Sequence, residues 1–200
     1  MSSLIYIHGF NSSPESTKAK IIGNSLSVLG FDSDSYIVPN LAYEPDQAIA
    51  SLVDCIETLK ARGEEIYLIG SSLGGYYATY LAAKYQLKTV LINPAVKPYE
   101  LLVDYLGSNK NIYTGDEYEI TQDHMAQLKA LDIDELASPE DVLLLVQTDD
   151  ETLDYHQATD KFWQSPSVIE YGGNHSFDDF PTKLLLIKQF FQASPREALS

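Results

Sequence analysis

Short apolar segments alternate with amphipathic segments along most of the chain. The apolar segments are rich in leucine, isoleucine and valine, and each ends at glycine, proline or polar residues, as strands do where the chain turns. Buried strands are therefore expected over 4–7, 36–38, 66–69, 90–92, 142–146 and 168–169. Near-continuous apolar strands separated by helices are typical of a parallel sheet with helices on both faces. The pattern predicts an α/β fold around a mostly parallel, six-stranded sheet.

Between the strands, apolar residues recur at helical spacing. Helices are expected to begin near Ser13-Pro14, at Pro45, at Leu73 and at Pro181. Ser13 would cap the first of them, and Gly30 would end it. Right-handed crossovers would bring the strand-to-helix turns to the carboxyl edge of the sheet, where active sites of open α/β sheets form.

Residues 95–140 interrupt this alternation. The segment is rich in tyrosine and acidic residues and is too long for a simple crossover. We interpret it as a small cap inserted over the carboxyl edge of the sheet, and an ordinary pair of surface helices is the alternative. Residues 1–193 would then form a single domain, with 194–200 as a flexible tail.

Composition narrows the possible partners. The 13 basic residues stand against 29 acidic ones, which gives a net charge of -16 and a surface that repels phosphate backbones and anionic lipids. Nucleic-acid and membrane partners are therefore not expected. Cys55 is the only cysteine, which excludes an internal disulfide and thiolate metal clusters. No apolar run is long enough to span a bilayer, so we expect a cytoplasmic protein. We also expect no metal or cofactor.

The strongest chemical signal is the segment Gly70-Ser71-Ser72-Leu73-Gly74, which matches the pattern G-x-S-x-G. A serine between a strand and a helix requires a sharp turn, and glycine two positions on either side removes the clash that a side chain would cause. Ser72 is the candidate nucleophile, and Ser71 is the competitor in register. A tight turn without chemistry is the other interpretation.

A serine hydroxyl needs a general base to accept its proton, and the chain has 4 histidines. His175 follows the last predicted strand and precedes the C-terminal helix, so its loop can reach over the carboxyl edge towards Ser72. It is our candidate base. His8 ends the first strand, His124 lies in the proposed cap, and His156 lies on a helix.

The carboxylate that orients the base should follow the penultimate strand. Asp149, Asp150 and Glu151 all stand there, and residue chemistry alone does not separate these neighbours. Asp178 and Asp179 are closer to His175 in sequence, but capping of the helix that begins at Pro181 explains them better.

Two backbone amides are candidates for an oxyanion hole. One is the N–H of Leu73, directly after the candidate nucleophile. The other is the N–H of Phe10, in the turn after the first strand, where Gly9 would let the backbone approach a substrate. Asn11 is a nearby polar group.

The ordered motifs resemble the α/β-hydrolase superfamily, and within it the bacterial YqiA-type esterase family. The resemblance spans about residues 3–193 and rests on segments 8–12, 70–76, 93–95, 147–151 and 173–175. It implies an α/β-hydrolase fold and esterase or acyl-thioesterase activity. By the same resemblance, Ser72, His175 and Asp150 form the catalytic triad.

The leading hypothesis is a serine hydrolase that cleaves small-molecule carboxylic esters through an acyl-enzyme. An acyl-CoA thioesterase is the alternative if Lys97 or Lys110 lies near the cleft, because coenzyme A is anionic. A non-catalytic binding protein of the same fold is a third possibility. Tyr76, Tyr99 and Tyr105 are candidate substrate contacts. Sequence does not set the oligomeric state.

Overall fold

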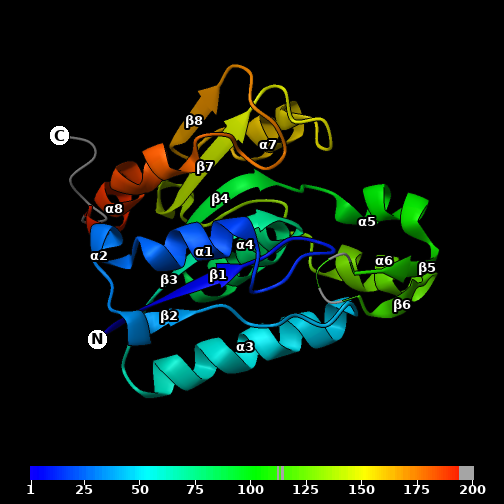
Figure 1. Ribbon diagram of the computed structural model, residues 1–200, viewed down its shortest axis with the longest axis horizontal. Helices are drawn as coiled ribbons and strands as arrows, with labels where there is room; N and C mark the ends of the chain where they lie inside the picture. Colours follow the sequence, from blue (N-terminus) through cyan, green and yellow to red (C-terminus); the bar gives the residue numbers. More distant parts are fainter. Residues whose placement is uncertain (112, 114, 194–200) are drawn as a thin grey trace.

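The computed structural model describes residues 1–111, 113 and 115–193. A 6-stranded sheet forms its centre, with the strand order β2-β1-β3-β4-β7-β8 and parallel pairing throughout (Figure 1). The strands are β1 (Ser2–Ile7), β2 (Tyr36–Ile37), β3 (Glu65–Ser72), β4 (Lys88–Pro94), β7 (Val142–Gln147) and β8 (Ser167–Glu170). Every predicted strand is confirmed, and so is the α/β architecture.

Helices cover both faces of the sheet (Figure 1). One face packs against α1 (Thr17–Asn24), α2 (Leu26–Leu29), the 3₁₀ turn η4 (Phe180–Lys183) and α8 (Leu184–Gln192). The other packs against α3 (Pro45–Ala61), α4 (Leu73–Tyr85) and α7 (Tyr155–Lys161). Because side chains alternate along a strand, Leu4 and Tyr6 of β1 enter the first core while Ile5 and Ile7 enter the second. Both faces of β1 are therefore buried.

The first helix begins later than the sequence pattern predicts. Its N-cap is Ser16, whose hydroxyl accepts a hydrogen bond from the amide of Ala19, whereas the hydroxyl of Ser13 accepts from the amide of Glu15 in a preceding turn. The chain also leaves the helical conformation at Ser25, between α1 and α2. Gly30 ends α2 in the left-handed conformation, as expected.

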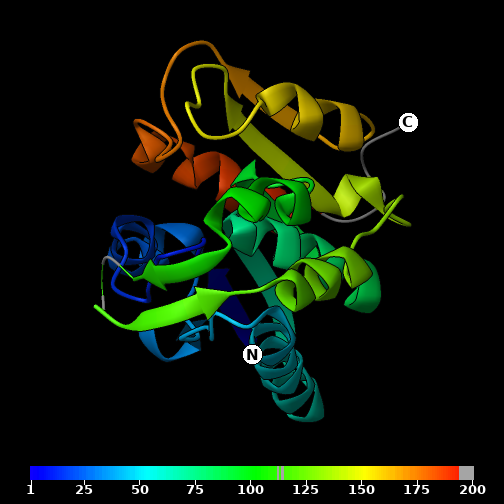
Figure 2. The same ribbon diagram turned by 90° about the vertical axis from the view of Figure 1, so that its right-hand side faces the viewer.

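The inserted segment differs from either sequence interpretation in one respect. It contains α5 (Pro98–Leu101), the turn η2 (Leu102–Tyr105), α6 (Gln122–Ala130) and the turn η3 (Pro139–Asp141), as well as an antiparallel hairpin of β5 (Gly107–Lys110) and β6 (Glu117–Ile120). The hairpin strands are short and polar, so they lack the apolar alternation that would have predicted them. The hairpin lies beside the turn that follows β1 (Figure 2).

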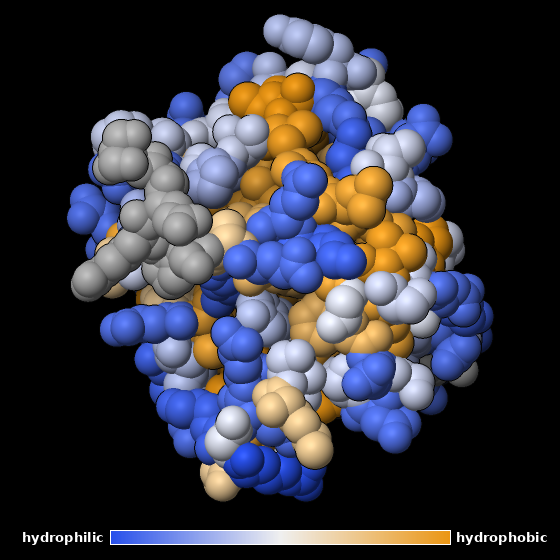
Figure 3. Space-filling view, turned by 90° about the vertical axis from the view of Figure 1, so that its left-hand side faces the viewer, coloured by the Kyte–Doolittle hydropathy of each residue, from blue (hydrophilic) through white to orange (hydrophobic). Residues whose placement is uncertain are grey.

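The amino edge of the sheet lies at the opposite end of the molecule. Figure 3 shows this end, where apolar areas lie between polar ones. The predicted tail 194–200 lies outside the described residues. Within the described part of the chain, no helix combines the length and the apolar character that crossing a bilayer requires.

Candidate active site

Ser72 lies at the turn between β3 and α4, in a strained backbone conformation. Its φ of 55° and ψ of -124° are rarely adopted by a residue with a side chain. A Cβ on Gly70 would lie 2.4 Å from the carbonyl oxygen of Gly74, and a Cβ on Gly74 would lie 2.0 Å from that of Ile7. The glycines on either side of Ser72 are thus required by backbone packing at this turn.

Three side chains from separate loops form one hydrogen-bonded chain. Nε2 of His175 lies 3.0 Å from Oγ of Ser72, and its Nδ1 lies 2.8 Å and 3.0 Å from the two oxygens of Asp150. The Asp150 side chain is only 2% exposed, and one oxygen also accepts from the amides of Thr152 and Leu153. Because the carboxylate is an acceptor, Nδ1 carries the proton and Nε2 is free to accept from the serine hydroxyl.

The neighbouring carboxylates point elsewhere. Asp149 is exposed and accepts a hydrogen bond from the hydroxyl of Thr148. Glu151 is also exposed, and it accepts from the backbone amide of His175 at 2.9 Å, which lowers the pKa of its carboxyl. Only Asp150, of these neighbours, contacts the imidazole.

Asp178 and Asp179 do not cap the following helix with their side chains. Asp178 instead accepts a hydrogen bond from the side chain of Asn174 at 2.7 Å. Asp179 stands at the cap position of η4 in the left-handed conformation without a side-chain hydrogen bond, and its carbonyl receives the amide of Thr182. The prediction of side-chain capping was wrong: Asp179 has a left-handed backbone, whereas an N-cap side chain usually reaches the helix amides from an extended one.

The other polar candidates have structural surroundings. Ser71 is buried, and its hydroxyl is hydrogen-bonded with that of Tyr6. His124 closes a capping box with Thr121 at the start of α6. His156 is exposed and pairs with Asp154.

His8 is buried at the end of β1. Its Nδ1 lies 3.0 Å from the carbonyl oxygen of Gly9, so this nitrogen carries the proton, and Nε2 has no partner among the described residues. Burial lowers the pKa of His8, which favours the neutral ring.

Asn93, at the end of β4, holds the loop that carries His175. Its side-chain amide donates to the carbonyl oxygens of Asn174 and His175 at 3.0 Å and 3.2 Å. Its side-chain oxygen accepts from the amide of Gln147 at 3.0 Å. Asn93 is 2% exposed, so these bonds are shielded from water.

Gln147, the last residue of β7, extends the same arrangement. Its side-chain oxygen accepts from the amides of Asn174 and Asp178, and its nitrogen donates to the carbonyl oxygen of Asp178. A Cβ on Gly173 would lie 2.0 Å from that side-chain oxygen, so glycine is needed where the loop crosses Gln147. Sequence reasoning missed Asn93 and Gln147 as site residues; the available signal was a polar residue ending a buried strand.

The turn after β1 lies directly beside Ser72. A Cβ on Gly9 would lie 3.0 Å from Cβ and 3.5 Å from Oγ of Ser72. Asn11 has a φ of 50°, and its side-chain oxygen accepts a hydrogen bond from the hydroxyl of Tyr118 in the inserted hairpin. The ring of Phe10 packs edge-on against those of Tyr105 and Tyr118. The turn that carries the Phe10 amide is thus supported by the inserted segment.

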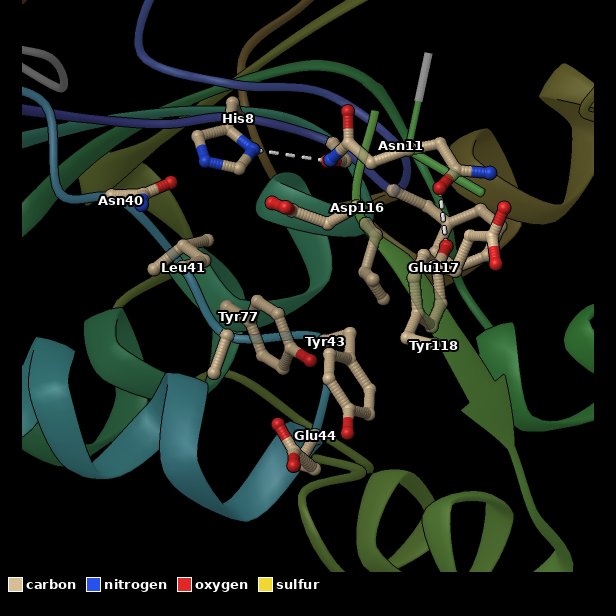
Figure 4. A pocket seen from close by; sticks show the side chains of 15 residues that line it. His8, Asn11, Asn40, Leu41, Tyr43, Glu44, Tyr77, Asp116, Glu117 and Tyr118 are labelled. Atoms are coloured by element: carbon tan, nitrogen blue, oxygen red, sulfur yellow. Dashed lines mark hydrogen bonds between the residues drawn. The ribbon is translucent and has the colours of Figure 1, made fainter. Parts of the chain in front are cut away.

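Two cavities meet at this turn. Cavity 1, of about 440 Å³, is lined by Phe10, Leu73, residues 40–44 directly before α3, and residues of the hairpin (Figure 4). Cavity 2, of about 430 Å³, is lined by Ser72, His175 and residues of α1 and the base loop. Gly9, Phe10 and Asn11 line both. Ser72 thus lines cavity 2 alone, directly beside the turn that the two cavities share.

Lys18 of α1 brings a positive charge into cavity 2. Its ammonium group donates to the carbonyl oxygen of Ser176 at 2.7 Å, next to the base. Burial lowers the pKa of Lys18 to about 8, opposed by the attraction of Asp150. By contrast, Lys97 pairs with Glu100 and Lys110 lies 3.9 Å from Glu117, and neither lysine lines either cavity.

The candidate tyrosines have different surroundings. Tyr76 is buried and donates to the carbonyl oxygen of Leu128. Tyr99 donates to Asp132. Tyr105 is exposed and contacts the site only through the ring of Phe10. No group of three or more side chains suited to bind a metal occurs among the described residues.

The comparisons with solved structures show the fold. Est1E from Butyrivibrio proteoclasticus, solved with ferulic acid, has a TM-score of 0.75 at 16% identity, covering 95% of this chain and 88% of that chain. A putative hydrolase from Agrobacterium vitis has a TM-score of 0.69 at 18% identity, covering 94% and 85%. The mouse alpha/beta hydrolase domain-containing protein 10 has a TM-score of 0.65 at 18% identity, covering 92% and 86%.

A family match covers nearly the whole chain. Residues 3–192 match the family described as uncharacterised protein family UPF0227. This match confirms the resemblance to YqiA-type proteins, and the structural neighbours confirm the α/β-hydrolase fold. The chain belongs to the UPF0227 family and has the α/β-hydrolase fold.

Proposed function

We propose that this chain is a serine hydrolase that cleaves small-molecule carboxylic esters through a covalent acyl-enzyme on Ser72. The observation that carries the proposal is the continuous chain of hydrogen bonds from Asp150 through His175 to Ser72. This arrangement lets a histidine take the serine proton while a buried carboxylate stabilises the imidazolium.

In the first half of the reaction, Oγ of Ser72 bonds to the carbonyl carbon of the ester and gives its proton to Nε2 of His175. The bond between that carbon and the leaving oxygen then breaks, and His175 passes the proton to the leaving oxygen. An alcohol departs, and the acyl group stays on Ser72.

In the second half, water takes the place of the alcohol. His175 accepts a proton from water as the water oxygen bonds to the acyl carbon, and it returns the proton to Oγ as the bond to Ser72 breaks. The acid is released, and the serine hydroxyl is restored. One ester and one water thus give one acid and one alcohol.

Both tetrahedral intermediates place negative charge on the former carbonyl oxygen. We assign the amides of Leu73 and Phe10 as its donors. Leu73 begins α4, where an amide has no partner within the helix, and the Phe10 turn lies against Ser72. Each such donor is worth roughly 3 kcal/mol of transition-state stabilisation.

The inserted residues 95–140 form the cap in this proposal, because their hairpin supports the Phe10 turn and lines cavity 1. We favour oxygen esters over acyl-CoA thioesters, since Lys97 and Lys110 line neither cavity and Lys18 alone, among the described lysines and arginines, lines cavity 2, a single cation against the several phosphate charges of coenzyme A. We keep the expectation of a cytoplasmic location. On the net charge of -16 we also keep the expectation that nucleic acids and membranes are not partners.

A fluorophosphonate probe tests the proposal. It should add one adduct to the intact protein, and peptide mapping should place the adduct on Ser72. His175→Ala should abolish labelling, while Ser71→Ala should leave it unchanged. Absence of an adduct on the folded protein, or an adduct on another residue, would favour the alternative of a non-catalytic binding protein.

A further inference from the structure

The two cavities offer different surroundings to the two halves of an ester. Cavity 2 contains His175, the group that must protonate the leaving oxygen in the proposed reaction. Cavity 1 is lined by Leu73 and the His8-Phe10 turn; neither Ser72 nor His175 lines it, and it reaches Ser72 only across the Gly9-Phe10-Asn11 turn that both cavities share. A tetrahedral carbon on Ser72 with its oxyanion towards the Leu73 and Phe10 amides therefore directs its leaving group into cavity 2. The acyl chain is left to enter cavity 1.

Four aromatic rings, of Phe10, Tyr43, Tyr77 and Tyr118, form one part of the lining of cavity 1, beside a polar part that includes three asparagines. The rings of Tyr43 and Tyr118 stack with centroids 4.8 Å apart, and Phe10 meets Tyr118 edge-on. Leu41 and Tyr77 complete the apolar part of the lining, as Figure 4 shows. Such walls favour a carbon chain or a ring over a strongly hydrated group.

The charges around cavity 1 are all of one sign. Glu44, Asp116 and Glu117 line it, and no lysine or arginine does so among the described residues. The contact between Lys110 and Glu117 spans 3.9 Å between largely exposed side chains, so it neutralises little. His8 is buried in the wall, and burial lowers its pKa and so favours its neutral form.

We infer that cavity 1 binds the acyl group and selects esters of uncharged monocarboxylic acids over esters whose acyl chain ends in a second carboxylate. The inference rests on the proposed function and names its substrate class. An anionic chain end would be drawn out of water into a site with aromatic walls and carboxylates but no cation.

A matched pair of substrates tests the charge selection. The 4-nitrophenyl ester of hexanoic acid and the mono-4-nitrophenyl ester of adipic acid have equal chain lengths and differ at the chain end. After correction for their rates with hydroxide, kcat/KM should favour the hexanoate by about tenfold or more. Equal values, or a preference for the adipate, would overturn the inference.

Charge variants connect that preference to cavity 1. The double variant Glu44→Gln with Glu117→Gln should reduce the hexanoate-to-adipate ratio by about threefold or more. Glu119→Gln is the matched control, because Glu119 lies on the same strand and lines neither cavity. If the control changes the hexanoate-to-adipate ratio as much as the double variant, the preference arises from the overall negative charge of the protein and not from the lining of cavity 1.

Blocking variants test which cavity holds the chain. Ala42 lines cavity 1 and Thr17 lines cavity 2. Ala42→Trp should lower the ratio of kcat/KM for 4-nitrophenyl hexanoate over acetate by about tenfold, while Thr17→Trp should leave that ratio unchanged. The reverse result would place the acyl chain in cavity 2.

The acetate ester also separates the two ideas. Its acyl group is too small to need cavity 1, so its hydrolysis depends only on the proposed chemistry at Ser72. If acetate is hydrolysed in a Ser72-dependent way but the ratios fail, only the acyl-site inference falls. If acetate is not hydrolysed and Ser72 takes no fluorophosphonate, the proposed function fails first.

Discussion

The two sides of Ser72 are held by different kinds of contact. On the base side, the buried side chains of Asn93 and Gln147 hydrogen-bond to the backbone of the loop that carries His175. On the oxyanion side, the Phe10 turn is supported by aromatic rings and one tyrosine hydroxyl from the inserted hairpin. The base is thus tied to the ends of sheet strands, whereas the opposite wall belongs to a segment outside the sheet.

This difference separates chemistry from selectivity. Buried hydrogen bonds to backbone define a single position, because breaking one leaves a polar group without a partner. Ring contacts at half-exposed positions tolerate changes in the side chains that form them. Changes on the base side should therefore act mainly on kcat, whereas changes in hairpin side chains that leave the Phe10 amide in place should act mainly on KM and substrate choice.

The largest effect should come from Ser72→Ala, which removes Oγ, the proposed nucleophile. Turnover of 4-nitrophenyl acetate should fall by roughly four to six orders of magnitude, as for triad members that act as a unit. His175→Ala should be similarly severe and Asp150→Asn somewhat milder. Steady-state assays with circular dichroism as a folding control check this, and a greater loss in Asp149→Asn would refute the choice of acid.

Asn93→Ala should have the next largest effect. It leaves the carbonyl oxygens of Asn174 and His175 and the amide of Gln147 without their partner, at a cost of about 1–3 kcal/mol in unfolding free energy. Because the base loop loosens, kcat should fall by about 10- to 100-fold with KM nearly unchanged. Urea unfolding and full kinetics separate the two effects, and a rise in KM at constant kcat would contradict a positioning role.

A smaller effect should follow from the charge of Lys18 in cavity 2. Because burial lowers its pKa to about 8, Lys18 loses its positive charge as pH rises from 7 to 9. The kcat/KM for 3-carboxyphenyl acetate relative to phenyl acetate should then fall by about threefold over this interval. Lys18→Met should show a low ratio at both pH values, and a pH-dependent ratio that survives in this variant would exclude Lys18 as its source.

Tyr118→Phe tests the hairpin side. The change removes the hydrogen bond to Asn11 but keeps the ring that contacts Phe10 and Tyr43. A two- to threefold rise in KM with little change in kcat is expected, at a cost of about 1 kcal/mol or less. Tyr105→Phe is the control, since its ring contact with Phe10 is retained. A tenfold fall in kcat for Tyr118→Phe would show that the hairpin also positions the chemistry.

The smallest effect should come from Glu151→Gln. The exposed side chain accepts the backbone amide of His175, and an amide oxygen can replace the carboxylate oxygen in that bond. Activity should change by less than about twofold, because exposed hydrogen bonds compete with water. A larger loss of activity would show that Glu151 helps to position His175.

Local sequence patterns specified the elements and the candidate chemistry. The apolar runs and their terminating residues predicted every strand of the sheet, because burial on both faces gives the central strands a continuous apolar run, and the half-exposed edge strands β2 and β8 keep a short one. The glycines around Ser72 likewise marked its turn from a five-residue window. The short polar strands of the hairpin left no such signature, since their pairing does not depend on an apolar face. The start of α1 is set locally by Ser16, and the Ser13-Pro14 pair offered a competing cap signal three residues earlier.

Tertiary contacts decided which side chains meet. Asp149, Asp150 and Glu151 have the same local chemistry, and only the direction of the chain after β7 brings Asp150 to the imidazole. The hydrogen bond between Ser72 and His175 joins residues separated by 103 positions. Side-chain direction and long-range loop packing determine such contacts, and neither is encoded in the periodicity of any one segment.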